Sequence, residues 1–288
     1  GVFVSTDAGA SWNWSSAGLT STAVYALAVA GTRLFAGTLG GGVFVSPDSG
    51  ATWSALNGGL TNLSVWTLAV QDTFLFAGTG GDGVFRTGLT AGSWSAATAG
   101  ITNSTVEAFG VMGTRLFAGT FGGGVFVSTN HGTSWTPATA GLTDPYLRAF
   151  AVDGTRLLAG TSDGGVFIST NFGTSWSPAG PGLLNRQVRS LLVTGGTLLA
   201  GTNGGVARSL DHGASWTTAN AGLVNTGLFA LITDVNTLYA GTDGSGVFRS
   251  DDGGLNWVAG NAGLTDPNVM SLVMSGHTLY AGAYNGLF

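Results

Sequence analysis

The sequence predicts an all-β fold, a seven-bladed β-propeller with four-stranded blades. Two observations indicate it: a motif that returns at a fixed interval, and a composition rich in Gly and apolar residues but poor in charge. The motif, Gly-Val-Phe or a close variant, begins at residues 1, 42, 83, 124, 165, 205 and 246, with a surplus copy at 286–288. A period of about 40 residues is typical of propellers and solenoids, in which each unit packs against the next.

Each unit contains four short strands. In the first unit, residues 2–5 form a β-rich run, and a polar turn leads to a second short strand at 12–16. A longer apolar run covers 24–29, and a Gly-Thr turn leads into 34–38. Apolar and β-branched runs between Gly, Asn, Asp, Ser and Thr are typical of strands. No stretch has the period of an amphipathic helix. Four such strands suit a propeller blade, which is buried against its neighbours.

The phase of the repeat predicts how the ring closes. The chain begins on the third strand of a blade and ends with the first two, so residues 1–17 should complete the blade whose inner strands lie near 268–283. A blade shared in this way leaves no exposed sheet edge. We expect residues 1–288 to form a single propeller domain. The surplus motif at 286–288 leaves open the alternative of a trimmed further unit, and hence of eight blades in a longer parent chain.

The composition argues against several classes of partner. The chain has a formal net charge of −5, all nine of its basic residues are Arg, and it has no Cys. Nucleic acids and anionic membranes require a basic surface, so neither is expected as a partner. No apolar run approaches the roughly 20 residues of a membrane span, so membrane insertion is not expected.

A characteristic turn joins the third and fourth strands in six of the seven units. It reads Ser-Thr-Asp-Ala-Gly-Ala-Ser-Trp at residues 5–12 and recurs at 46–53, 128–135, 169–176, 209–216 and 250–257. These copies resemble the Asp box, Ser-x-Asp-x-Gly-x-x-Trp, of the bacterial-neuraminidase-repeat (BNR, sialidase-like) families. Those families include sialidases, some endoglucanases, sortilin-type receptors and photosystem II assembly factors. The resemblance implies a bacterial protein that is extracellular or on the cell surface.

The acidic position of the box is interpreted as structural. It is occupied in the six copies by Asp7, Asp48, Asn130, Asn171, Asp211 and Asp252. An oxygen here can accept hydrogen bonds from the turn, and Asn does this as well as Asp. A metal ligand or a catalytic acid would not be exchanged so freely, so calcium binding is the weaker alternative. We therefore expect no metal site and no cofactor. The Trp that ends each box is expected to pack between blades.

The units differ most at one position, at the start of the innermost strand. We call its occupants the rim residues: Tyr25, Trp66, Glu107, Arg148, Arg189, Phe229 and Met270. The neighbouring loop residues are equally mixed and include Tyr146 and Arg186. In a propeller the innermost strand lines the channel, so these side chains should surround its mouth, at the end opposite the Asp boxes. Varied side chains on a constant frame suit a recognition surface. Drift at unconstrained positions is the alternative.

Three charged rim residues fall on consecutive units. Glu107, Arg148 and Arg189 suggest a small site in which Arg forks hold a carboxylate or a sulfate. The alternative is a salt bridge between Glu107 and Arg148 across neighbouring blades. A solvated position is expected for three other basic residues, which lie in short turns at the Asp-box end: Arg33, Arg115 and Arg156.

The resemblance makes a sialidase-like glycoside hydrolase the enzymatic alternative. Such enzymes use an Arg triad, a Tyr–Glu nucleophilic pair and an acidic Asp. This chain has one Glu, Glu107, and its nearest Tyr candidate is Tyr146. All loops are short, and no pair of carboxylates is placed for glycoside cleavage. We therefore assign no catalytic residue.

The sequence favours a non-catalytic, extracytoplasmic propeller that binds a glycan or a protein at the rim. A structural role is the alternative. In that case the ring would be a self-assembling unit of a surface layer or filament, packing on other copies of itself or on other domains of a longer chain.

Overall fold

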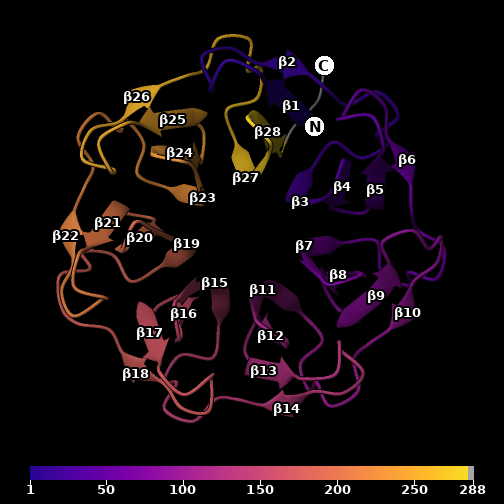
Figure 1. Cartoon of the computed structure of the whole chain (residues 1–288), viewed down its shortest axis with the longest axis horizontal. Coiled ribbons are helices and arrows are strands. Elements are labelled where there is room, and N and C mark those ends of the chain that lie inside the picture. The colour runs from indigo at the N-terminus through magenta and orange to yellow at the C-terminus, as the bar shows by residue number, and fades with distance from the viewer. Residues whose placement is uncertain (285–288) are drawn as a thin grey trace.

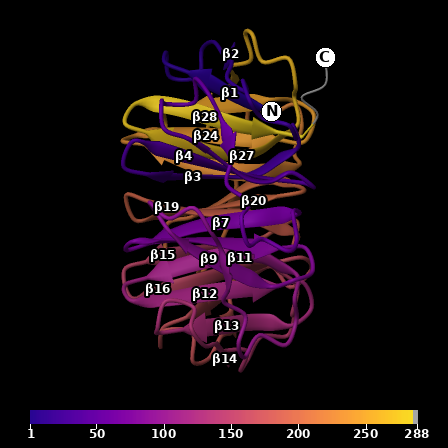
Figure 2. The same ribbon diagram turned by 90° about the vertical axis from the view of Figure 1, so that its right-hand side faces the viewer.

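The computed structural model describes residues 1–284, which form seven four-stranded antiparallel sheets arranged as a ring around a channel (Figure 1). The ring is shortest along the channel axis, as the side view shows (Figure 2). This arrangement confirms the predicted seven-bladed β-propeller. Residues 1–284 contain no helix, and so none that is long and apolar enough to cross a membrane.

The four strands of a blade shorten from the channel outward. The innermost strands have seven residues: β3 (Val24–Ala30), β7 (Val65–Gln71), β11 (Val106–Met112), β15 (Leu147–Asp153), β19 (Val188–Thr194), β23 (Leu228–Asp234) and β27 (Val269–Ser275). The second strands have six: β4 (Arg33–Thr38), β8 (Phe74–Thr79), β12 (Arg115–Thr120), β16 (Arg156–Thr161), β20 (Thr197–Thr202), β24 (Thr237–Thr242) and β28 (Thr278–Ala283).

The two outer strands are shorter still. The third strands are β1 (Val2–Ser5), β5 (Gly42–Ser46), β9 (Val84–Gly88), β13 (Gly124–Ser128), β17 (Val166–Ser169), β21 (Gly205–Ser209) and β25 (Val247–Ser250). The outermost strands have two residues each: β2 (Asn13–Trp14), β6 (Ser54–Ala55), β10 (Ser95–Ala96), β14 (Thr136–Pro137), β18 (Ser177–Pro178), β22 (Thr217–Thr218) and β26 (Val258–Ala259).

The core lies between the blades, at the level of the second and third strands. Leu34, Phe35 and Ala36 of β4 are all buried, because neighbouring blades cover both faces of this strand. Gly37 follows them, and a Cβ atom there would lie 2.7 Å from Cγ1 of Val65 on the next blade. The Leu-Phe-Ala-Gly-Thr segment therefore owes its composition to close packing on two sides.

The ring closes through a shared blade, as the phase of the repeat predicted. Strand β1 pairs with β28 in antiparallel register, with Val2 opposite Gly282 and Ser5 opposite Leu279. The blade has the order β2-β1-β28-β27, so the indigo and yellow ends of the chain meet in one sheet (Figure 1). The surplus motif at 286–288 lies outside the described residues.

The Asp-box turns are held by hydrogen bonds within the turn. Oδ1 of Asp7 accepts hydrogen bonds from the backbone N–H of Ser11 at 2.9 Å and from the hydroxyl of Ser5 at 2.8 Å. Oδ1 of Asn130 accepts the equivalent two bonds, both at 2.9 Å. An amide thus replaces the carboxylate as the acceptor of this turn, in line with the structural interpretation of the position.

Candidate functional site

Every rim residue lies at a β-bulge of its inner strand. In the first blade Val24 pairs with Thr38 and Ala26 pairs with Gly37, so Tyr25 has no partner in the ladder. The register shifts at the equivalent position of all seven inner strands. A bulge leaves its extra residue unpaired and redirects the side chain. The position at which the repeats vary most is therefore also the one left out of the hydrogen-bond ladder.

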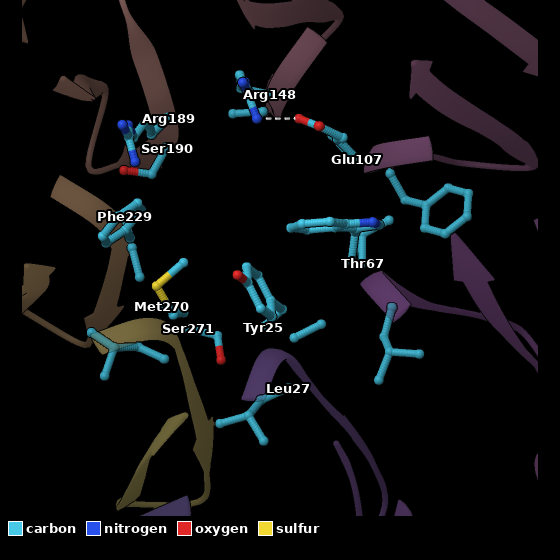
Figure 3. A pocket seen from close by; sticks show the side chains of 18 of the residues that line it. Tyr25, Leu27, Thr67, Glu107, Arg148, Arg189, Ser190, Phe229, Met270 and Ser271 are labelled. Atoms are coloured by element: carbon cyan, nitrogen blue, oxygen red, sulfur yellow. Dashed lines mark hydrogen bonds and ion pairs between the residues drawn. The ribbon is translucent and has the colours of Figure 1, made fainter. Parts of the chain in front are cut away.

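The rim residues surround a cavity of about 570 Å³ at one end of the channel, which we call the channel cavity (Figure 3). Three consecutive residues of each inner strand line it. The first of each three is the rim residue. The third belongs to an apolar ring deeper in the channel: Leu27, Leu68, Phe109, Phe150, Leu191, Leu231 and Leu272. The volume falls in the range of about 300–1,000 Å³ that is usual for small-ligand sites.

Two residues that the sequence placed at the rim lie outside this lining. Tyr146 is 40% exposed on the loop before β15 and packs its ring edge-on against Phe121, with 4.8 Å between centroids. Arg186 is exposed on the loop before β19. Neither is part of the cavity wall.

The rim divides into two arcs of different chemistry. Phe229, Met270, Tyr25 and Trp66 come from four successive blades and form an aromatic arc. The rings of Tyr25 and Trp66 meet edge to face with 4.6 Å between centroids, and Tyr25 also contacts Tyr284 at 5.8 Å. Burial raises the pKa of Tyr25 to about 12, so its hydroxyl stays neutral at ordinary pH.

The other three blades supply the charged arc. The guanidinium of Arg148 donates to Oε2 of Glu107 on the neighbouring blade, and its Nε donates to the hydroxyl of Ser162 at 3.0 Å (Figure 3). Burial raises the pKa of the Glu107 carboxyl, and the adjacent Arg148 offsets this in part. The salt bridge that the sequence left as an alternative is therefore present.

Arg189 is in a different state from Arg148. Within residues 1–284 its guanidinium forms no hydrogen bond and no ion pair, and it stacks over the ring of Phe229 at 4.5 Å from the centroid. Burial, and then the charge of Arg148, lower its pKa. A partly dehydrated cation with unused N–H donors can accept an anionic ligand.

The Arg residues at the Asp-box end, which were expected to be solvated, are partly exposed and also make contacts within the protein. The guanidinium of Arg33 donates to the backbone carbonyl of Leu89 on the next blade. That of Arg115 stacks over Phe172 at 4.7 Å, again on the next blade. Arg156 pairs with an Asp of its own blade at 3.3 Å.

Sequence reasoning also missed a set of His–Asp contacts at that end. All three His of the chain lie beside an Asp of the preceding blade. The pairs and their N–O distances are His131–Asp72 (3.5 Å), His212–Asp153 (2.7 Å) and His277–Asp234 (3.3 Å). The recurrence of His in turns was the only available signal, because the partners are 43 to 59 residues apart.

The described residues contain no cluster of three or more His, Cys, Asp or Glu that could hold a metal ion. Glu107 is the one carboxylate among the residues that line the channel cavity. Glycoside hydrolases of the usual kind use two carboxyl groups that flank the bond to be cleaved. Within residues 1–284 the lining of the cavity contains no such pair.

No protein-family model matches this sequence, and no curated protein matches it. Solved structures share the fold. The extracellular domain of the one component system BT4673 from B. thetaiotaomicron is 18% identical over 94% of this chain and 38% of its own length, with a TM-score of 0.78. YCF48 bound to D1 peptide is 16% identical over 93% of this chain and 96% of its own, with a TM-score of 0.69.

A glycoside hydrolase is among these neighbours. The GH74 xyloglucanase from Xanthomonas campestris is 16% identical over 92% of this chain and 51% of its own length, with a TM-score of 0.69. The chain thus spans about half of the xyloglucanase and well under half of the BT4673 domain. At these identities the likeness shows the fold alone, a β-propeller.

Proposed function

We propose that this protein is an extracytoplasmic binding module that holds a glycan or a protein segment in the channel cavity and does not transform it. One observation carries the proposal. Seven side chains of six kinds, all unpaired in their ladders, surround a single cavity of about 570 Å³. Side chains that strand pairing does not constrain and that converge on one cavity are suited to recognition.

The aromatic arc favours a ligand with flat or apolar faces. Trp and Tyr offer large, rigid contact surfaces, and such residues dominate the binding free energy at many interfaces. Among the fold neighbours, one structure holds a peptide and others are extracellular domains or an enzyme named for a polysaccharide. These functions belong to those proteins; they support extracytoplasmic binding of a peptide or glycan here.

A binding screen tests the proposal. The protein would be applied to glycan and peptide arrays beside a Tyr25→Ala/Trp66→Ala variant, which removes two neighbouring rings of the aromatic arc. Phe172→Ala is the matched control, because Phe172 is a 43% exposed aromatic residue at the opposite, Asp-box end. We expect binding by the wild type and the control, and at least about a tenfold loss in the rim variant. Equal binding by all three would place recognition elsewhere.

A structural role is the second candidate, and the outer edge of the ring favours it. Val258 of β26 is 70% exposed and Trp14 of β2 is 51% exposed, and these outermost strands belong to adjacent blades. An unpaired edge strand with apolar side chains can pair with another copy. Light scattering at rising protein concentration tests this: a constant monomer mass would exclude self-assembly through these edges.

A further inference from the structure

The two Arg residues of the rim differ in how fully their donors are used. Arg148 gives hydrogen bonds to Glu107 and Ser162, so its charge is already opposed by a carboxylate. Arg189 makes no hydrogen bond and no ion pair among residues 1–284, although burial has removed part of its hydration. A half-buried guanidinium has lost hydrogen bonds to water without replacing them. Binding of an anion would supply new ones and so be favourable.

The contact of Arg189 with Phe229 leaves the N–H donors of the guanidinium without a partner among residues 1–284. The central carbon of the guanidinium lies over the ring of Phe229, 4.5 Å from the centroid. The N–H donors lie along the edge of the planar group. A carboxylate binds to that edge with two parallel hydrogen bonds. Since the contact with Phe229 also limits the rotation of the side chain, less conformational entropy is lost when the anion binds.

The charges that line the cavity favour an anion with a single charge. Glu107, Arg148 and Arg189 are the charged lining residues, and they sum to +1. Asp243 lies near Arg189 but outside the lining, is exposed to water and forms no ion pair with it among the described residues. One negative charge therefore neutralises the lining. A second would remain uncompensated beside the buried Glu107 carboxylate.

The surfaces next to Arg189 are apolar. Phe229 and Met270 follow it around the rim, with Tyr25 next, and the side chains of all three lie around the same opening (Figure 3). Directly below them is the apolar ring of Leu and Phe. A ligand anchored at Arg189 thus meets apolar surface on the side and at depth, and burying that surface contributes about 25 cal/mol per Å².

We propose that the channel cavity selects a monocarboxylate with an apolar body. Its carboxylate binds the free edge of Arg189, and its apolar part lies on Phe229, Met270 and the apolar ring. This inference rests on the proposed binding function and names the ligand class for the same cavity.

A matched pair of probes tests the charge requirement. 3-Phenylpropionate and 3-phenylpropionamide have nearly the same shape and differ in charge. Titration calorimetry or NMR would compare them on the wild type, Arg189→Gln and Arg186→Gln. The last is the control: it removes the same charge from an exposed position on the loop just before β19, close to Arg189 in the sequence but outside the cavity. Thermal unfolding would verify that all three proteins are folded.

We expect the wild type and Arg186→Gln to bind the acid at least about tenfold more tightly than the amide, and Arg189→Gln to bind the two equally. Raising the salt concentration should weaken binding of the acid alone. The inference is overturned if acid and amide bind the wild type equally, if neither binds, or if Arg189→Gln keeps the preference. Binding of a neutral glycan or peptide that depends on Trp66, with no preference for the acid, would reject this inference and leave the proposed function intact.

A second pair of probes separates two sources of the same chemistry. A short peptide ending in Phe, prepared as the free acid and as the C-terminal amide, presents an apolar carboxylate at the end of a chain. Tighter binding of the peptide acid, in competition with 3-phenylpropionate, indicates a protein terminus as the ligand. Binding of 3-phenylpropionate alone indicates a free small molecule. Both results support the ligand class.

Discussion

The indole N–H of Trp53 donates a 2.7 Å hydrogen bond to the backbone carbonyl of Ser15, which lies 38 residues earlier on the preceding blade. The same bond, with the same separation, is made by Trp94, Trp135, Trp176 and Trp257. Each of these five Trp residues therefore fills the space between two blades, and its side chain is bonded to the backbone of the preceding blade.

One box Trp departs from this pattern and gives a stability prediction. Nε1 of Trp216 is buried and has no partner among the described residues, whereas Nε1 of Trp135 bonds to the carbonyl of Ala97 at 2.7 Å. Trp135→Phe should therefore lower the free energy of unfolding by about 1 kcal/mol more than Trp216→Phe. Only the first change breaks a hydrogen bond and leaves the buried acceptor without a donor. Denaturant melts of both variants measure the difference. Equal losses would show that packing alone matters.

The Asp boxes predict sensitivity to acid. The pKa values of Asp7, Asp48, Asp211 and Asp252 are lowered to about 2, chiefly by hydrogen bonds from the residue four positions later. A carboxyl group whose pKa is lowered by folding stabilises the fold above its unfolded value of 3.8, and that stability is lost as the pH falls toward 2.

Replacing these four Asp with Asn should flatten this dependence. Asn130 and Asn171 already hold their boxes without a titrating group. Thermal unfolding between pH 5 and about pH 2 should show a smaller decline in Tm for the fourfold variant than for the wild type. Parallel declines would mean that other carboxyl groups govern acid unfolding.

Substitution of Arg148 should destabilise the protein more than substitution of Glu107. Arg148→Ala leaves a largely buried carboxylate without its counter-ion, at an expected cost of about 1–3 kcal/mol near neutral pH. Glu107→Gln also removes the bridge but leaves no buried charge, so it should cost less. The raised pKa of Glu107 fixes the sign of the pH effect: its contribution is most favourable below the unfolded value and is lost as the pH rises. The deficit of Arg148→Ala should therefore shrink at pH 4, and a deficit independent of pH would contradict the assignment.

A pair of Gly residues separates backbone strain from steric clash. Gly141 has a φ of +86°, and a Cβ there would lie 2.1 Å from the carbonyl oxygen of Trp176 on the next blade. Gly154 has a φ of +59° and nothing within 4 Å. Gly154→Ala should cost about 1–2 kcal/mol for the left-handed backbone alone. Gly141→Ala should cost a further 1–3 kcal/mol or so from overpacking. Similar melting temperatures for the two variants would refute a role for Gly141 in blade spacing.

The repeat made most of the fold predictable. Its interval gave the blade number, and its phase placed the pairing of β1 with β28, because both depend only on distances along the chain. The convergence of the rim residues on one cavity followed as well, since equivalent residues of a closed ring must meet at its axis.

Contacts between blades were harder to foresee. Whether Glu107 pairs with Arg148 or leaves it open to a ligand depends on rotamers, and the sequence left both alternatives standing. The contacts of the turn Arg residues and the His–Asp pairs were missed for a related reason. His212 and Asp153 are 59 residues apart, and they meet only because the turns that carry them lie side by side on adjacent blades. A single sequence does not reveal this alignment.

The bulge at each rim residue has a consequence for how such proteins change over generations. Since Tyr25 and its equivalents contribute nothing to the strand ladder, exchanging one of them leaves the hydrogen bonds of its blade intact. Substitutions at the rim can then accumulate one blade at a time without disturbing strand pairing, which depends on the other forty or so residues of each unit. Neighbouring rim residues still constrain one another through their side chains, as Tyr25 with Trp66 and Glu107 with Arg148 show.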